Sequence, residues 1–163
     1  MSLNSTAGSA SAESYASVAQ ATARHLALGN DTWATISNQQ MEEALRRATV
    51  FMTQSYRLRW IGIRATSTQA LEWPRYSACV DGYPIAVDIV PTDIINACCD
   101  LALKAAAGDL APDLERAVKR EKIGPIETEY ETYSSQVTSY RSINMALAPY
   151  LKGSSGMATL VRT

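Results

Sequence analysis

The segment from residue 37 to residue 55 constrains the fold of this chain most, because it carries the full pattern of an amphipathic helix. Ser37 followed by Gln40 matches a capping box, in which each side chain accepts from the other residue's backbone amide. Glu42 and Glu43 each precede an arginine by four residues, the favourable orientation for helical ion pairs. Apolar residues recur at steps of three and four: Met41, Leu45, Ala48 and Met52. The segment therefore predicts a helix with one buried face and one charged, solvated face.

Three further segments have helical spacing. The first begins near Tyr15 and stops at Gly29-Asn30, and the second opens at Pro91 and ends at Gly108. The apolar stripe of the second is wide enough to face both a core and a neighbouring subunit. The third follows a predicted cap at Ser139. These patterns predict a mainly α fold, a small helical bundle of about four helices with extended N- and C-terminal tails.

Residues 117–133 alternate in the manner of a β-hairpin, with a turn at Gly124-Pro125. The first strand is basic, with Lys119, Arg120 and Lys122, and the second is acidic, with Glu127, Glu129 and Glu131. Opposite charges that face each other across two strands stabilise the pair modestly. Because a lone hairpin is marginal in water, we expect it to lean on a helix or to pair with another subunit.

The two ends of the chain differ in composition from the middle. Residues 1–12 are rich in Ser, Ala, Thr and Gly, and we expect a flexible segment there. Residues 13–151 form the predicted helical domain. Residues 152–163 are a Gly/Ser linker that ends in an apolar group, which predicts a docking tail that something receives. The docking residues of this tail are Met157, Leu160, Val161 and Arg162.

The stretch from residue 56 to residue 75 holds three aromatic residues, four arginines and only one carboxylate. Neither helical nor strand periodicity fits it, so it is predicted to be an extended, ordered connection. Ser67 or Thr68 is expected to cap one short helical turn, which Pro74 ends. Large rings are costly to leave in water, so Trp60 and Trp73 are expected to be packed beneath the connection. Such a stretch could hold a nucleic acid, clamp a partner or join two halves of a core.

No catalytic constellation is visible in the sequence. Net charge is −1, which argues mildly against a protein that grips phosphate backbones. The single His25 has no acid–base partner, and no Gly-rich phosphate loop or metal-ligand spacing is present. The three cysteines are predicted to be buried free thiols, and no apolar run spans a membrane. We expect a cytoplasmic protein that is not an enzyme and holds no cofactor or metal.

Several segments resemble one bacteriophage family. They are Asn30–Trp33, Ala44–Thr49, Tyr56–Trp60, the Gln-Ala-Leu-Glu-Trp-Pro-Arg segment 69–75, the Val-Lys-Arg-Glu-Lys-Ile-Gly-Pro-Ile-Glu segment 118–127, and Leu160–Arg162. The chain is similar, over about residues 15–162, to head–tail adaptor (head completion, connector) proteins of long-tailed phages. Sequences of this kind are also described as DnaT-like single-stranded-DNA-binding proteins. The chain departs from the pattern at Cys98-Cys99 and at its long Ser-rich start.

The resemblance implies a structural virion protein made in the host cytoplasm and placed at the head–tail junction. Copies would form a ring, a dodecamer that matches the portal, and double-stranded DNA would pass through without being read. The implied partners are the portal protein, the next neck or tail component (stopper or tail terminator), and further copies of the chain. No membrane is involved.

Two hypotheses therefore stand for the function. The first is the ring protein, whose subunit or portal contacts we place at Arg57, Arg59, Arg64, Trp73, Arg75, the basic hairpin strand and the docking tail. Planar guanidinium groups suit such contacts because they pair with carboxylates through two parallel bonds. The second is a single-stranded-DNA-binding module, with Tyr56, Trp60 and Trp73 as stacking platforms and the same arginines on phosphates.

Overall fold

A computed structural model describes residues 2–112, 118–122, 127–130 and 139–153. Within these ranges the protein is mainly α, as predicted. The helices are α1 (Val18–Ala27), α2 (Asp31–Ala34), α3 (Asn38–Tyr56), α4 (Thr92–Ala107), α5 (Arg141–Leu147) and the 3-10 turn η1 (Ala148–Tyr150). The strands are β1 (Ile63–Arg64), β2 (Arg75–Tyr76), β3 (Cys79–Val80), β4 (Tyr83–Pro84), β5 (Val118–Lys122) and β6 (Glu127–Tyr130).

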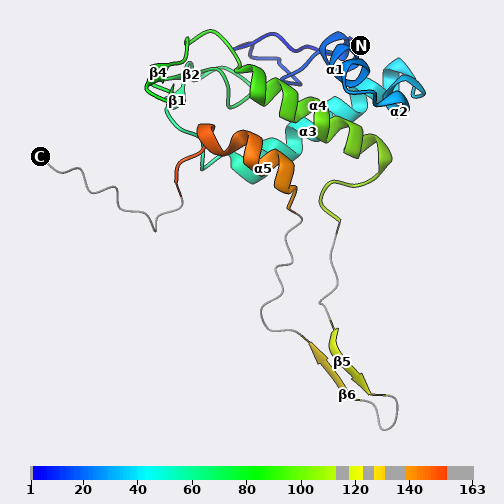
Figure 1. The fold of residues 1–163 in the computed structure, drawn as a ribbon. Coiled ribbons are helices and arrows are strands. Elements are labelled where there is room, and N and C mark those ends of the chain that lie inside the picture. The colour runs from blue at the N-terminus through cyan, green and yellow to red at the C-terminus, as the bar shows by residue number, and fades with distance from the viewer. Residues whose placement is uncertain (1, 113–117, 123–126, 131–138, 154–163) are drawn as a thin grey trace, which may run out of the picture.

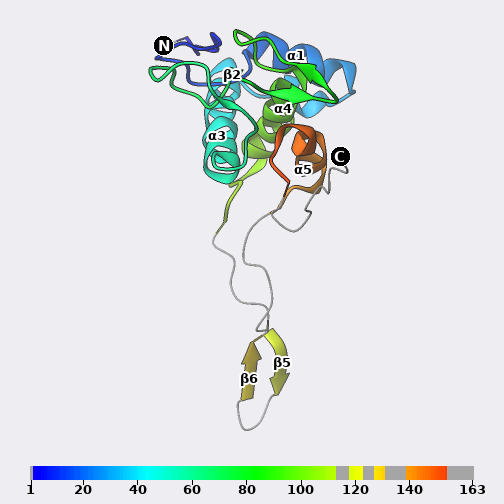
Figure 2. The ribbon, with the colours of Figure 1, turned by 90° about the vertical axis from the view of Figure 1, so that its left-hand side faces the viewer.

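Helix α4 is the centre of the bundle, in contact with α1, α3 and α5 (Figures 1 and 2). This position explains its broad apolar stripe, which we expected to be wide enough to face both a core and a neighbouring subunit. The stripe is instead covered within the chain, because three helices pack on different sides of it. Its buried members are Ile94, Ala97, Cys98, Cys99, Leu101, Ala102 and Ala105.

The helix ends follow local capping rules. The predicted capping box is present at Ser37, and a second one, which we did not predict, starts α1 at Ser17. Gly108 caps α4 as expected. The last helix, α5, is present as predicted, but its predicted cap was wrong: Tyr140 is the N-cap, while Ser139 accepts a bond from the Asn144 side chain at 2.9 Å.

The connection between α3 and α4 is built from short strand pairs. Strand β1 pairs antiparallel with β2, and β3 with β4. Asp81 and Gly82 both have positive φ, the backbone of a tight hairpin turn, and so confirm the predicted turn. Gly62 also has positive φ, and a Cβ there would lie 2.5 Å from the Tyr76 carbonyl oxygen. The connection therefore requires glycine where β1 and β2 meet.

The N-terminal segment, which we expected to be flexible, is hydrogen-bonded to the domain in this structure. The backbone amide of Glu13 donates to the Asn4 carbonyl oxygen at 2.7 Å, and that of Ala70 donates to the Ser9 carbonyl oxygen at 3.0 Å. The Asn4 side chain donates to Ser9 and Ser11. The segment has few apolar residues to bury, so we expected it to be flexible. Backbone and polar side-chain hydrogen bonds hold it in place instead.

The predicted hairpin is confirmed in its strands, β5 and β6, which pair antiparallel with Arg120 opposite Glu129 and Lys122 opposite Glu127. The turn at residues 124 and 125 lies outside the described residues, as does the docking tail with Met157, Leu160, Val161 and Arg162. In the described part of the chain, no helix is long and apolar enough to cross a bilayer.

Candidate interaction surfaces

The aromatic residues of the 56–75 stretch form a buried chain of rings. Tyr56 contacts Trp60 with ring centres 5.8 Å apart, Trp60 meets Trp73 edge-to-face at 5.9 Å, and Trp73 meets Tyr150 at 5.9 Å. Trp60 and Trp73 are 0% and 1% exposed. The expectation that both tryptophans are packed is confirmed. The prediction that these rings stack on bases is wrong, because a base cannot reach a buried ring. The prediction that Trp73 contacts a neighbouring subunit is wrong for the same reason.

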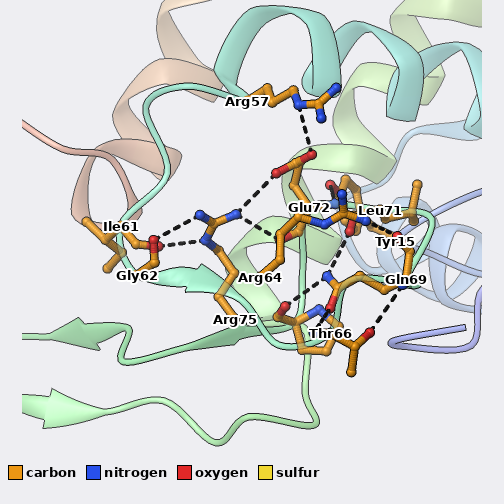
Figure 3. A network of polar contacts seen from close by, with 11 residues as sticks. Tyr15, Arg57, Ile61, Gly62, Arg64, Thr66, Gln69, Leu71, Glu72 and Arg75 are labelled. Carbon is orange, nitrogen blue, oxygen red and sulfur yellow. Dashed lines mark hydrogen bonds and ion pairs between the residues drawn. The ribbon is translucent and has the colours of Figure 1, made fainter.

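Arg75 is also buried, at 6% exposure, and its guanidinium is bonded within the chain (Figure 3). Nε donates to the Ile61 carbonyl oxygen at 2.7 Å, and Nη2 donates to that of Gly62 at 2.9 Å. Nη1 donates to Glu72, both to its carbonyl oxygen at 3.1 Å and to its carboxylate at 3.2 Å. Burial lowers the pKa of Arg75, and the Glu72 carboxylate opposes that shift. Arg75 therefore joins the two ends of the connection and is not free to contact a neighbouring subunit.

Glu72 is the acceptor at the centre of this network (Figure 3). One carboxylate oxygen faces Arg75, and the other lies 3.3 Å from Nε of Arg57. Its backbone amide donates to the Tyr15 hydroxyl at 3.1 Å, and burial raises the pKa of Tyr15. The sequence signal for this site was the single carboxylate among four arginines. We did not predict from it that Glu72 would be the buried partner of Arg75.

Gln69 replaces the predicted helical turn. Its side-chain amide donates to the carbonyl oxygens of Leu71 and Pro74 at 2.8 and 3.0 Å, and its side-chain oxygen accepts from the Thr66 amide. Arg64, which is partly buried, donates to the Gln69 carbonyl oxygen. These side chain–backbone bonds fix an irregular segment that no periodic pattern could reveal, and they leave neither Gln69 nor Arg64 as an open contact residue.

Arg57 and Arg59 are the arginines of the stretch that face solvent. We call Arg57, Leu58, Arg59 and Lys152 the α3 corner. The Arg57 side chain is 60% exposed despite its ion pair, and Leu58 is 88% exposed. The Lys152 amide donates to the Arg59 carbonyl oxygen at 2.6 Å, which brings two basic residues from distant parts of the sequence together. The corner is thus a small basic surface around one exposed leucine.

A groove runs between the second half of α3 and the end of α4; we call it the α3–α4 groove. Its cavity is about 260 Å³. Phe51 and Leu110 are nearly buried in its floor, while Val50 is 54% exposed. Arg47 lines the groove from α3, and Asp109 lines it from the residues that follow α4. The lining residues are Arg46, Arg47, Val50, Phe51, Gln54, Ala105, Gly108, Asp109, Leu110 and Ala111.

Strands β1–β4 and the loop after β4 lie together at one end of the molecule, which we call the sheet end (Figure 1). Several apolar side chains are exposed there. Ile63 and Tyr76 are opposite each other in the β1–β2 register and are 62% and 56% exposed. Tyr83 in β4 is 75% exposed. The other exposed members are Val87 and Ile89. The sequence does not single out these residues, because their spacing is the same for an exposed pair as for a buried one.

The thiols and the histidine have structural surroundings. Cys98 and Cys99 are buried as predicted, but Cys79 is exposed, contrary to expectation. Burial raises the pKa of Cys98, and it raises that of Cys99 to about 12, so neither forms a thiolate readily. Nε2 of His25 donates to the Cys99 carbonyl oxygen at 3.0 Å. The described ranges contain no group of acidic, histidine and cysteine residues that could hold a metal ion.

Lys119, Arg120 and Lys122 of the predicted interface lie in β5. Arg120 and Lys122 stand opposite Glu129 and Glu127 of β6, while Lys119 falls at the register shift between Val118 and Arg120.

Comparison with known proteins gives one match. The family model described as "Putative DnaT-like ssDNA binding protein" matches residues 1–163. No curated protein and no solved structure matches the chain.

Proposed function

The chain belongs to the family described as DnaT-like ssDNA binding protein, and within that family we propose that it acts as a head–tail adaptor of a tailed bacteriophage. Copies form a ring between the portal and the next neck or tail component, and DNA passes through. The resemblance of several sequence segments to such adaptors supports this role. The family description names single-stranded DNA instead, and so supports the second candidate below more directly.

The observation that carries the adaptor proposal is the apolar surface at the sheet end. Ile63, Tyr76 and Tyr83 are each more than half exposed. Ile63 and Tyr76 stand opposite each other across the β1–β2 pair, and neighbouring exposed apolar side chains are a mark of protein–protein contact sites. Trp60 and Trp73, the rings that base stacking would need, are buried in the core. The balance of buried and exposed residues therefore favours a protein partner.

A ring suits this kind of surface. Each copy contributes a modest contact, and closure repeats that contact until no free edge remains. Docking a ring onto a second, matching ring adds avidity from many weak contacts. The docking tail, residues 152–163, is the proposed portal contact. Its deletion is expected to abolish portal binding in a pull-down, while binding that persists would remove the tail from the proposal.

The second candidate is single-stranded-DNA binding. Besides the family description, two features favour it: the α3 corner presents Arg57, Arg59 and Lys152, and the exposed rings of Tyr76 and Tyr83 could stack on bases in place of the buried tryptophans. A complex of this kind would weaken steeply as salt rises, because phosphate contacts release counterions.

Fluorescence anisotropy with labelled oligonucleotides at two salt concentrations separates the candidates. The adaptor proposal expects no binding at low salt. Saturable binding that falls steeply with salt, and is lost in an Arg57→Ala/Arg59→Ala variant, would establish the second candidate instead. Arg141→Ala is the matched control, since Arg141 is an exposed arginine on α5, outside the α3 corner.

A further inference from the structure

We infer that the α3 corner of one copy docks on the sheet end of a second copy of this chain. This inference rests on the proposed ring and deepens it, since it names the contact by which one copy meets the next. Three properties of the described residues support the contact: exposed apolar side chains on both surfaces, charges of opposite sign, and a backbone that holds each surface in place.

Both surfaces expose apolar side chains. Leu58, in the corner, is 88% exposed, the largest exposed fraction among the large apolar side chains of the described residues. A side chain that projects so far into solvent suits an apolar surface on a partner, because removing both from water is favourable. The sheet end offers such a surface, since it holds half of the exposed large apolar side chains: Ile63, Tyr76, Tyr83, Val87 and Ile89.

The charges of the two surfaces are opposite. The corner contains three basic residues and no acidic one, and the side chains of Arg59 and Lys152 form no ion pair with any described residue. Residues 76–90, which include β3, β4 and the loop after β4, contain Asp81 and Asp88 and no basic residue. Both aspartates are exposed, and neither forms an ion pair within the described ranges. Complementary charge of this kind favours contact between corner and sheet end over contact between two corners.

Backbone hydrogen bonds fix the corner. The Lys152 amide donates to the Arg59 carbonyl oxygen at 2.6 Å. The Ile61 amide donates to the Tyr150 carbonyl oxygen at 3.0 Å, and the Trp60 side chain between them is buried in the core. The backbone that carries Leu58 and its basic neighbours is therefore ordered before any partner binds.

The sheet end is held in the same way. Strands β3 and β4 pair antiparallel on either side of the Asp81-Gly82 turn. Where β4 ends, the Ile85 amide donates to the Ala78 carbonyl oxygen at 2.9 Å. Surfaces that are ordered before association lose less conformational entropy when they meet, so a contact of modest area can form between them.

A second copy is the occupant that these surfaces indicate, because each surface finds its complement on the same chain. Corner and sheet end are different surfaces, so each copy would use its corner toward one neighbour and its sheet end toward the other. Such a head-to-tail contact closes into a ring when the rotation between copies permits.

Charge reversal in the full-length chain tests the contact, with association followed by sedimentation equilibrium up to high protein concentration. Wild type is expected to self-associate. Arg59→Glu and Asp88→Lys are each expected to weaken association at least tenfold, because each places like charges opposite one another. An equimolar mixture of the two variants is expected to restore association, since every corner can then face a sheet end of opposite charge.

Two controls carry the same changes of charge at other places. Arg141→Glu alters an exposed arginine on α5. Asp109→Lys alters an exposed aspartate that follows the C-terminal end of α4, whereas the sheet end precedes the N-terminal end of that helix. Both controls are expected to associate as wild type does.

Three outcomes would overturn the inference: a wild-type chain that stays monomeric throughout, single reversals that match their controls, and a mixture that fails to recover. Failure of the adaptor role would look different. If the corner binds single-stranded DNA instead, Arg59→Glu abolishes oligonucleotide binding, and adding Asp88→Lys does not restore it. If a neck ring is seen while the single reversals match their controls, the adaptor role stands and this contact is removed from it.

Discussion

Arg75 and Arg59 belong to the same connection between α3 and α4, yet Arg75 is buried and Arg59 is exposed. Arg75 is 6% exposed and donates to Glu72 and to the carbonyl oxygens of Ile61 and Gly62. Arg59 is exposed on the α3 corner, where its backbone oxygen binds the amide of Lys152. The difference follows from the single carboxylate of the stretch, because a buried guanidinium requires acceptors and a nearby counter-charge.

The comparison shows that an arginine-rich, aromatic-rich stretch is not one surface. Its C-terminal half, with Glu72, Trp73 and Arg75, is the internal frame of the connection. Its start presents Arg57, Leu58 and Arg59 to solvent. Functional proposals for this stretch must therefore rest on the exposed part, and stability should depend on the buried part.

The largest effect is expected for Trp73→Ala. The ring is 1% exposed and touches both Trp60 and Tyr150, so its removal leaves a cavity in the core. Truncation of a buried tryptophan costs about 3–5 kcal/mol of unfolding free energy. Chemical denaturation followed by circular dichroism measures it. A loss below about 1 kcal/mol would mean that the ring is not a core anchor.

Arg75→Met tests the buried half directly and is expected to cost about 3 kcal/mol, because Glu72 keeps only its exposed partner Arg57. The matched control Arg59→Met should change unfolding free energy by less than about 0.5 kcal/mol. Adding Glu72→Gln to Arg75→Met should recover part of the loss, since no unpaired buried charge then remains and Arg57 is exposed. If Arg75→Met and Arg59→Met lowered the free energy of unfolding equally in the same assay, the buried and exposed halves of the stretch would not differ in their contribution to stability.

Gly62→Ala is expected to cost about 1–3 kcal/mol, because the residue has positive φ and the new methyl group would meet the Tyr76 carbonyl oxygen at 2.5 Å. Gly153→Ala is the control, since none of the described residues lies within 4 Å of a Cβ there. Thermal unfolding of both variants compares them. A neutral Gly62→Ala would show that β1 and β2 do not approach as closely as the structure has them.

The smallest effect is a pH dependence from His25. Its burial lowers the pKa of the imidazole in the folded state, while the unfolded pKa is about 6.5. The unfolded chain therefore binds the proton more readily, so stability is fully present above pH 6.5 and is lost as pH falls toward the folded pKa. Denaturation midpoints from pH 7.5 to 5 should fall in wild type and fall less in His25→Gln. Parallel curves would contradict the assignment.

The sequence predicted those parts of the molecule in which the pattern is periodic or local. Helix α3 with its Ser37 capping box, the Asp81-Gly82 turn and the strands of the hairpin all follow from spacing that neighbouring residues determine. The burial of Trp60 and Trp73 followed from the cost of exposing large rings.

The remainder depends on contacts between distant residues. Which of four arginines is buried was decided by Glu72 and by the carbonyl oxygens of Ile61 and Gly62, and none of these has a distinctive spacing. The apolar stripe of α4 could not be assigned to the core until α1, α3 and α5 were seen around it. The groove beside Arg47 is likewise formed by two helices that are far apart in sequence.

Electron cryo-microscopy of the neck of tailed particles assembled with this chain tests the central claim most directly. The adaptor account predicts a closed ring of copies between the portal and the tail, with the helical domain fitting each protomer's density. Tailed, DNA-filled particles that assemble without the chain, or a neck that contains no copy of it, would contradict the account.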